Sequence, residues 1–242
     1  MPIHFDILYS DDSLVVIDKP SGWLSVPDRY DPEAPVAVRE LAKTEGELFV
    51  VHRIDKDTSG VLIFARNAEA HRALSEAFET RSVAKTYRAI VRGSPVWDEE
   101  SCDLPLKADG DRRHRTVVDA GRGKTSRTVF TVLERYRGSG FSAALIEAHP
   151  ETGRTHQIRV HLAAMGYPCL CDPLYGSPEP LFLSKVKGKW KGDAWEERPL
   201  IARTALHAAR AEFLHPTTGE KLAIDAPEPK DFRASRTQLA KL

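Results

Sequence analysis

The stretch Val51-His52-Arg53-Ile54-Asp55-Lys56-Asp57-Thr58-Ser59-Gly60 decides how this chain is interpreted. It lies between two apolar runs, 48–50 and 61–64, which are rich in branched and aromatic residues and are typical of buried strands. Turn residues such as Asp57, Ser59 and Gly60 are expected between strands. Arg53 and Asp55 are not expected in such a turn. In an extended chain their side chains point to the same face. A cation beside a carboxylate favours the charged carboxylate, so the stretch is a candidate site.

Composition and charge limit the classes of function that are possible for this chain. The 242 residues include 35 Lys and Arg and 35 Asp and Glu, so a general basic field for nucleic acid is absent. Local basic segments exist at 107–127 and 185–191, and solvated loops are their simplest explanation. The three cysteines favour a reducing compartment over a disulfide framework, and Cys169-x-Cys171 fits no common zinc spacing. We find no signal peptide or membrane span and therefore expect a cytoplasmic protein.

The order of elements predicts an α+β fold with a mixed, mainly antiparallel sheet. Strands are expected at 5–9, 14–17, 84–91, 125–136, 141–148, 168–172, 205–213 and 221–225. Helices are expected at 36–44, after an Asn67 cap to about Thr80, and from a Thr155 cap to Gly166. We expect one catalytic domain over 1–242, with two lobes sharing one sheet and a central cleft. It would carry an irregular basic insertion at 177–203 and a loose polar tail at 227–242.

Several further stretches complete a resemblance to RluA-type RNA pseudouridine synthases. His52–Gly60 resembles the family's H-R-L-D-x-x-T-S-G, with Ile54 for Leu. The other matching stretches, in the family's order, are Asp18–Gly22, Lys85–Tyr87, Thr152–His161, Gly166–Pro168, Asp172–Gly176 and Leu206–Ala208. Cys171 stands where this family usually has Gly. Many relatives carry an N-terminal S4 domain, which we expect to be absent because the first strand begins by residue 5.

The resemblance implies an isomerase that cleaves N1–C1′ of a flipped-out uridine and forms C5–C1′. It implies catalytic roles for Asp55 (attack), Tyr87 (stacking and proton transfer) and Arg154 (pairing with the aspartate). Arg53 would fill the space left by the base, and Leu206 would line the pocket. His52 and Thr58 are further candidates for RNA contact, although Thr58, Ser59 and Gly60 also shape the turn.

The resemblance also implies partners. We expect a stem-loop of ribosomal or transfer RNA as substrate, no metal or organic cofactor, no obligate protein partner and a monomer. Candidate RNA-binding side chains in the insertion are Lys185, Lys187, Lys189 and Lys191. Two alternatives stay open: a uracil-releasing N-glycosidic hydrolase, and a non-catalytic RNA-binding or RNA-folding protein on the same fold. The sequence does not choose between direct attack at C1′ and a glycal route.

Overall fold

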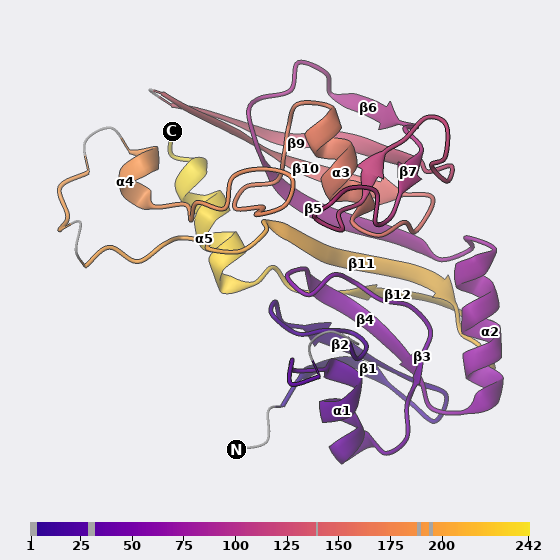
Figure 1. The fold of residues 1–242 in the computed structure, drawn as a ribbon. Coiled ribbons are helices and arrows are strands. Elements are labelled where there is room, and N and C mark those ends of the chain that lie inside the picture. The colour runs from indigo at the N-terminus through magenta and orange to yellow at the C-terminus, as the bar shows by residue number, and fades with distance from the viewer. Residues whose placement is uncertain (1–3, 29–31, 139, 188–189, 194–195) are drawn as a thin grey trace. The chain divides into compact units, whose positions relative to one another are not determined.

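The computed structural model describes residues 4–28, 32–138, 140–187, 190–193 and 196–242. The chain divides into two compact units (Figure 1). The first unit comprises residues 1–86 and 207–227, and the second comprises residues 87–206 and 228–242. Each unit has its own hydrophobic clusters.

The first unit contains a mixed sheet with a helix on each face. Its strand order is β1 (Asp6–Ser10), β2 (Leu14–Lys19), β4 (Ser59–Ala65) and β11 (Leu206–Leu214), to which the second unit contributes only residue 206. The strands β3 (Phe49–Val50) and β12 (Lys221–Asp225) pair with β4 and β11. The β4–β11 pair is parallel, and the other pairs are antiparallel.

Alternation along β2 and β4 explains the two helices of the first unit. Val15, Ile17, Leu62 and Phe64 pack against α1 (Ala37–Glu45), while Leu14, Val16, Val61 and Ile63 pack against α2 (Ala68–Glu79). Both strands are therefore apolar on two faces, as expected of strands covered on both sides. The predicted cap of α2 is confirmed, because the Asn67 side chain accepts the Ala70 N–H at 2.9 Å.

The second unit contains an antiparallel sheet with the order β5 (Ala84–Arg92, from residue 87), β10 (Phe141–Pro150), β9 (Thr128–Gly138) and β6 (Glu99–Cys102). A separate pair joins β7 (Leu106–Lys107) to β8 (Val117–Val118). The helix α3 (Gln157–Ala164) lies against β9 and β10, and α4 (Leu183–Val186) and α5 (Lys230–Leu239) complete the unit (Figure 1). The predicted α+β class and mainly antiparallel pairing are confirmed.

Three local predictions were wrong. Residues 168–172 form turns with one isolated bridge, Val91 to Cys169, instead of a strand. The cap of α3 is His156, in the left-handed conformation (φ 54°), and not Thr155. The tail is not loose, because Lys230–Leu239 form α5 and bury Phe232 and Leu239 against the core of the second unit. These two apolar residues lie seven apart, which places them on one helix face in an otherwise polar stretch.

The basic insertion 177–203 contributes to folding as well as to charge. Leu181, Val186 and Ile201 are buried in the same cluster as Phe232. Leu181 pairs with Ile201 across the insertion, since the Leu181 N–H donates to the Ile201 carbonyl at 2.9 Å. Its described ends are therefore fixed to the second unit.

Candidate functional site

The predicted site residues are divided between the two units. His52, Arg53, Asp55 and Thr58 belong to the first unit. Tyr87, Arg154, Leu206, Lys185 and Lys187 belong to the second, as does Lys191. Lys189 lies outside the described residues.

The segment that carries Asp55 is extended, as its sequence predicts. Arg53 is exposed, Ile54 is 7% exposed, and Asp55 is half-buried, so the side chains alternate between two faces. The Ser25 hydroxyl donates to the Ile54 carbonyl at 2.9 Å and accepts the Ile54 N–H at 3.1 Å. Both polar backbone groups of the residue before Asp55 are therefore fixed by one buried side chain.

The Asp18–Gly22 motif holds the other side of Asp55. Lys19 is fully buried, and its ammonium donates to the carbonyls of Pro20, Trp23 and Lys56 at 3.0, 2.8 and 3.1 Å. The Gly22 N–H also donates to the Lys56 carbonyl, at 2.9 Å. A buried ammonium needs such acceptors, because an unpaired charge in the core is costly. Residues 19–25 thus form a cradle for the backbone on both sides of Asp55.

His52 has the contacts of a structural residue. Its ring stacks on Phe78 with centroids 4.4 Å apart, and its Nε2 accepts the Ile63 N–H at 2.9 Å. Burial, together with the nearby Lys85 cation, lowers the pKa of His52 from 6.5 to about 3. The neutral ring therefore anchors the start of the Asp55 segment to β4. Contact of His52 with RNA stays a prediction.

The Thr58-Ser59-Gly60 turn joins the Asp55 segment to β4 and β11. Thr58 is buried, and its N–H donates to the Asp55 carbonyl at 3.1 Å. The Ser59 hydroxyl and His207 Nδ1 are 3.0 Å apart. Gly60 has φ 112°, and a Cβ there would lie 2.1 Å from the Ala208 carbonyl oxygen, so only glycine fits. The turn-shaping role expected for these residues agrees with this geometry.

In the second unit, Gln157 fixes the turn that carries Arg154. Its side-chain oxygen accepts the Thr152 hydroxyl at 2.7 Å and the Arg154 N–H at 3.0 Å. Its amide donates to the Arg127 carbonyl and the Thr128 hydroxyl, both at 2.9 Å. The Arg154 guanidinium donates to the Thr125 carbonyl through Nε and Nη2 at 3.1 and 3.0 Å. These bonds orient a half-buried arginine at the start of α3.

The rest of this motif supports α3 from within. Arg159 and Asp172 form a buried bidentate ion pair at 2.7 and 2.8 Å. Burial alone would raise the pKa of Asp172, but the hydrogen bonds and charge of Arg159 outweigh it and the pKa is lowered. The Tyr175 hydroxyl lies 2.9 Å from His156 Nδ1 and accepts the Thr116 N–H at 3.1 Å. Two motifs that are separate in sequence therefore form one polar cluster.

Tyr87 and Leu206 lie in one apolar cluster of the second unit. Leu206 is buried there with Ala89 and Val91, and Tyr87 packs against the same cluster. The Tyr87 ring therefore shares a face of β5 with those two residues and contacts packed structure. An aromatic ring anchored in this way offers a rigid surface for a base.

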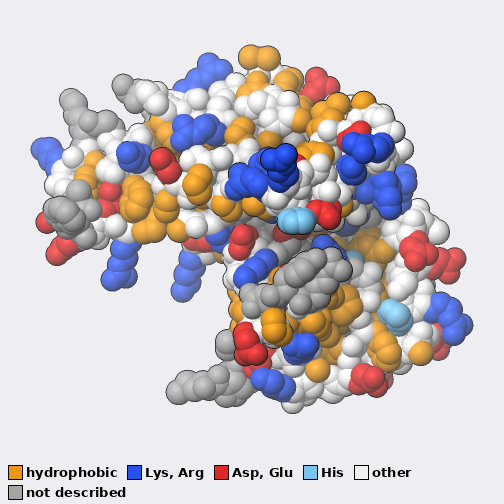
Figure 2. All heavy atoms as spheres, viewed as in Figure 1, with side chains coloured by type: hydrophobic (Ala, Val, Ile, Leu, Met, Phe, Trp, Pro, Cys, Tyr) orange, Lys and Arg blue, Asp and Glu red, His pale blue; other side chains and the backbone are white. Residues whose placement is uncertain are grey.

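The two basic segments differ in how their charges are used. Between 107 and 127, Arg115, Arg122 and Arg127 form ion pairs with Asp111, Asp119 and Asp103. Arg112, Arg113 and Lys124 are exposed and have no ion-pair partner among the described residues. Lys185 and Lys191 are also exposed. Figure 2 shows Lys and Arg side chains at several places on the visible surface of the second unit.

Cys102, Cys169 and Cys171 are buried and lie outside any disulfide in the part of the chain that the structure describes. No group of three or more His, Cys, Asp or Glu side chains that could hold a metal ion occurs in the part of the chain that the structure describes. In the same part, no helix is both long and apolar enough to cross a membrane.

Sequence reasoning missed the positioning residues around these sites. Ser25 and Gln157 each hold a backbone segment next to a predicted catalytic residue. The available signal for Ser25 was a hydroxyl within the short apolar run Trp23-Leu24-Ser25-Val26. For Gln157 there was an amide directly before Ile158 at the start of an apolar helix face. Neither pattern states which backbone group the side chain will reach.

Comparisons with known proteins point to one family. The family model described as RNA pseudouridylate synthase matches residues 13–164. The chain is 35% identical over 93% of its length to the dual-specificity RNA pseudouridine synthase RluA of Pasteurella multocida, covering 93% of that protein. It is 39% identical over 96% of its length to ribosomal large subunit pseudouridine synthase D of Xanthomonas campestris pv. campestris, covering 68% of that protein.

A solved structure extends the likeness to the fold. Human RNA pseudouridylate synthase domain containing 4 has a TM-score of 0.72 and 27% identity, over 97% of this chain and 93% of that one. The family model covers more than half of the chain and includes the segments of Asp55, Tyr87 and Arg154. The chain therefore belongs to the RNA pseudouridylate synthase family, whose members are isomerases that act on uridines in RNA.

Proposed function

We propose that this isomerase converts specific uridines of structured RNA, ribosomal RNA foremost, to pseudouridine with Asp55 as its catalytic carboxylate. Support comes from the family match together with the use of the motif residues. Lys19, Ser25, His52, Gln157, Arg159 and Asp172 are engaged in holding the fold around the site. Asp55 and Arg154 are half-buried side chains carried by the segments that these residues fix. Arg154 keeps its hydrogen bonds to the Thr125 carbonyl, and the family resemblance designates it, with Asp55 and Tyr87, for the chemistry.

The proposed reaction requires few groups. The N1–C1′ bond of uridine breaks, the uracil turns, C5 bonds to C1′, the C5 proton leaves, and N1 takes up a proton. The Asp55 carboxylate either bonds to C1′ as positive character develops there, as carboxylates do in glycosidases, and leaves again when C5 attacks C1′, or removes the 2′ proton in a glycal route and returns it when C5 bonds to C1′. Arg154 would pair with Asp55, and Tyr87 would stack on the base and assist proton transfer.

Several finer points belong to the same proposal. The base would leave its stack before reaction, which costs least in a loop, so a stem-loop is the expected substrate. Arg53 would occupy the space that the base leaves, and Leu206 would line the uracil pocket. The enzyme would act as a monomer without an obligate protein partner, in the cytoplasm. The three reduced, buried thiols fit such a reducing compartment.

Tritium release from RNA that carries 5-³H-uridine tests the reaction directly. Tritium leaves C5 only when the new carbon–carbon bond forms there. Ribosomal and transfer RNA transcripts are tested separately, with Asp55→Ala as the inactive variant and Asp57→Ala, two residues away, as its matched control. Release with the parent and Asp57→Ala but not with Asp55→Ala supports the proposal. Equal release with Asp55→Ala contradicts the role of Asp55, and free uracil in place of tritium would indicate a hydrolase.

A further inference from the structure

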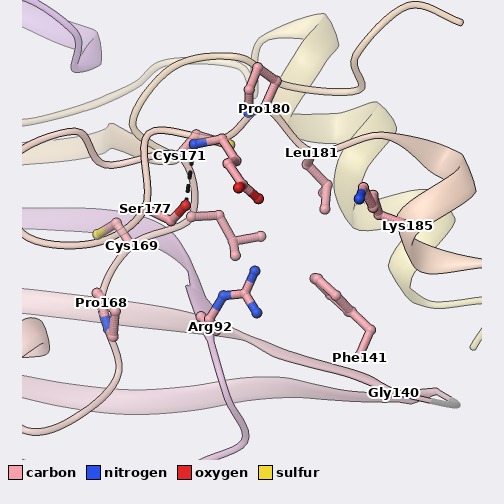
Figure 3. Close-up of a pocket in the computed structure, with 12 residues that line it drawn as sticks. Arg92, Gly140, Phe141, Pro168, Cys169, Cys171, Ser177, Pro180, Leu181 and Lys185 are labelled. Atoms are coloured by element: carbon pink, nitrogen blue, oxygen red, sulfur yellow. Dashed lines mark hydrogen bonds between the residues drawn. The ribbon is translucent and has the colours of Figure 1, made fainter.

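The second unit contains a pocket that lies apart from the residues assigned to catalysis. It has a volume of about 260 Å³ and is lined by Arg92, Phe141, Leu181, Glu179 and Lys185, among others (Figure 3). On β5, the Tyr87 side packs in the cluster of Ala89 and Val91. Arg92 shares the other face with Ile90, because side chains alternate along a strand. The pocket therefore opens on the face of β5 opposite to Tyr87.

The walls of the pocket are part of the core and are held by backbone bonds. Phe141, Leu170, Cys171 and Leu181 are each at most 8% exposed and belong to one cluster. The Leu170 N–H donates to the Ile90 carbonyl at 2.8 Å, and the Arg92 N–H donates to the Pro168 carbonyl at 2.9 Å. The pocket is thus formed before any ligand arrives, which reduces the entropy lost on binding.

Charged side chains surround the pocket without neutralising one another. Arg92 extends into it from β5, and its guanidinium lies 5.7 Å from the centre of the Phe141 ring (Figure 3). Glu179 and Lys185 belong to the basic insertion. In the described parts of the chain, Arg92, Glu179 and Lys185 have no ion-pair partner. A pocket with fixed apolar walls and unpaired groups of both signs is suited to a ligand that offers acceptors and donors together.

We infer that this pocket binds the base of one unpaired guanosine in RNA. Guanine presents the O6 and N7 acceptors on one edge, which an arginine contacts in a bidentate manner. Its neighbouring edge carries N1–H and the N2 amino group, both donors suited to a carboxylate. Arg92 and Glu179 supply these two partners, and Lys185 supplies a cation for the nucleotide's phosphate. Adenine would present its N6 amino group where Arg92 requires an acceptor.

The size and surroundings of the pocket favour a single nucleotide of RNA. About 260 Å³ is close to the lower end of the range for small-molecule sites, so the pocket admits one nucleotide and no longer stretch. Lys187 and Lys191 follow Lys185 in the same basic segment of the sequence. This inference takes RNA as the source of the guanine and in that respect rests on the proposed function.

Binding of short RNA tests the inference. The probe is a fluorescein-labelled heptamer with a central guanosine among adenosines, compared by anisotropy with the all-adenosine heptamer. Neither contains uridine, so catalysis cannot intervene. The parent and a distant control, Glu99→Gln, should prefer the guanosine heptamer by about fivefold or more. Arg92→Ala and Glu179→Gln should lose this preference, with circular dichroism showing that both variants are folded.

Nucleoside analogues show which edge of guanine contacts Arg92 and which contacts Glu179. Inosine lacks the N2 amino group. The parent should therefore bind a heptamer with inosine in place of guanosine more weakly, and Glu179→Gln should bind the two heptamers equally. 7-Deazaguanosine lacks N7. The parent should therefore bind a heptamer that contains it more weakly than the guanosine heptamer, and Arg92→Ala should bind the two equally. Equal binding of the two heptamers by the parent, or a preference that survives in both variants, would overturn the inference. Displacement of the heptamer by micromolar GMP would overturn RNA as the source and point to a free nucleotide.

The result of the heptamer-binding test is independent of the result of the tritium-release test of the proposed function. Tritium release without a guanosine preference would reject the guanine pocket and leave the pseudouridine synthase proposal intact. A guanosine preference without tritium release would support the pocket and reject the proposed reaction for the RNAs tested. Glu99→Gln changes the same charge outside the pocket and should release tritium at the parent's rate.

Discussion

The Ser25 hydroxyl bonds to both polar backbone groups of Ile54, accepting the N–H at 3.1 Å and donating to the carbonyl at 2.9 Å. Ser25 is 3% exposed and Ile54 is 7% exposed, so water cannot easily replace these bonds. Because Asp55 follows Ile54 directly, the position of its carboxylate depends on a residue that lies 30 positions earlier in the chain. With Asp55 in its proposed role, catalysis should be sensitive to Ser25, although Ser25 carries no charge.

Ser25→Ala should lower kcat about tenfold to a hundredfold and leave KM for RNA nearly unchanged. The change removes no group from the RNA-binding surface, but it leaves two buried backbone groups unpaired next to Asp55. Ser25→Thr keeps the hydroxyl and should recover much of the rate. Single-turnover and steady-state tritium release measure both constants. An equal rise in KM, or a fully active Ser25→Ala protein, would contradict this positioning role.

Gly60→Ala should destabilise the first unit by several kcal/mol or prevent its folding. The added Cβ would lie 2.1 Å from the Ala208 carbonyl oxygen, where β4 meets β11, and φ 112° disfavours any other residue. Gly46→Ala is the matched control, since Gly46 also has a positive φ (80°) but a Cβ there meets no atom within 4 Å. Urea unfolding followed by circular dichroism should show a loss of about 1–3 kcal/mol for the control, because φ 80° and ψ −161° at Gly46 lie in a region that is essentially restricted to glycine. Similar losses for both variants would show that contact with Ala208 is unimportant.

His52 should make the stability of the protein depend on pH. Its pKa is about 3 in the folded protein, against an ordinary value of 6.5, so the unfolded chain binds a proton that the folded chain rejects. The free energy of unfolding is therefore unaffected by protonation of this group above pH 6.5. It falls as the pH drops from 6.5 toward 3, by up to about 1.4 kcal/mol per pH unit. His52→Gln should be less stable at pH 7, because it loses the Phe78 stacking, and should lose less stability between pH 6 and pH 4. Parallel pH curves for the two proteins would contradict this assignment.

Asp172→Asn should cost about 3–5 kcal/mol of unfolding free energy, because it leaves the Arg159 guanidinium buried without its counter-charge. Arg159→Met combined with Asp172→Asn should be less damaging than the sum of the two single changes. Thermal unfolding of the four proteins in a double-mutant cycle measures this coupling. Simple additivity of the two losses would show that the pair does not act as a unit.

Lys187→Glu with Lys191→Glu should weaken RNA binding and reduce its dependence on salt, if the insertion contacts phosphates. Affinity for an RNA transcript is measured at several salt concentrations. Arg233→Glu with Lys241→Glu changes the net charge equally and serves as the control. Equal losses with both pairs would indicate a general charge effect, and no loss with either would remove the insertion from the RNA-binding surface.

The sequence alone determined the local elements and the chemistry-bearing residues. Alternation and apolar runs indicated most strands, since a residue's face in a strand follows from its position. The Asn67 cap could be predicted because its bond reaches only three residues along the chain. The motif around Asp55 could be recognised because its charged residues lie between two core strands, where folding does not require them.

The tertiary structure decided which partners these residues meet. The polar stretch 230–239 is a helix because Phe232 and Leu239 find an apolar cluster built from residues 90–205. The left-handed His156 begins α3 where its ring meets Tyr175, a contact that no local pattern encodes. Ser25, Lys19 and Gln157 act on backbone groups that packing brings within 3.1 Å. Local order follows from neighbours in the chain, whereas the supports of the Asp55 and Arg154 segments follow from contacts that only the folded chain makes.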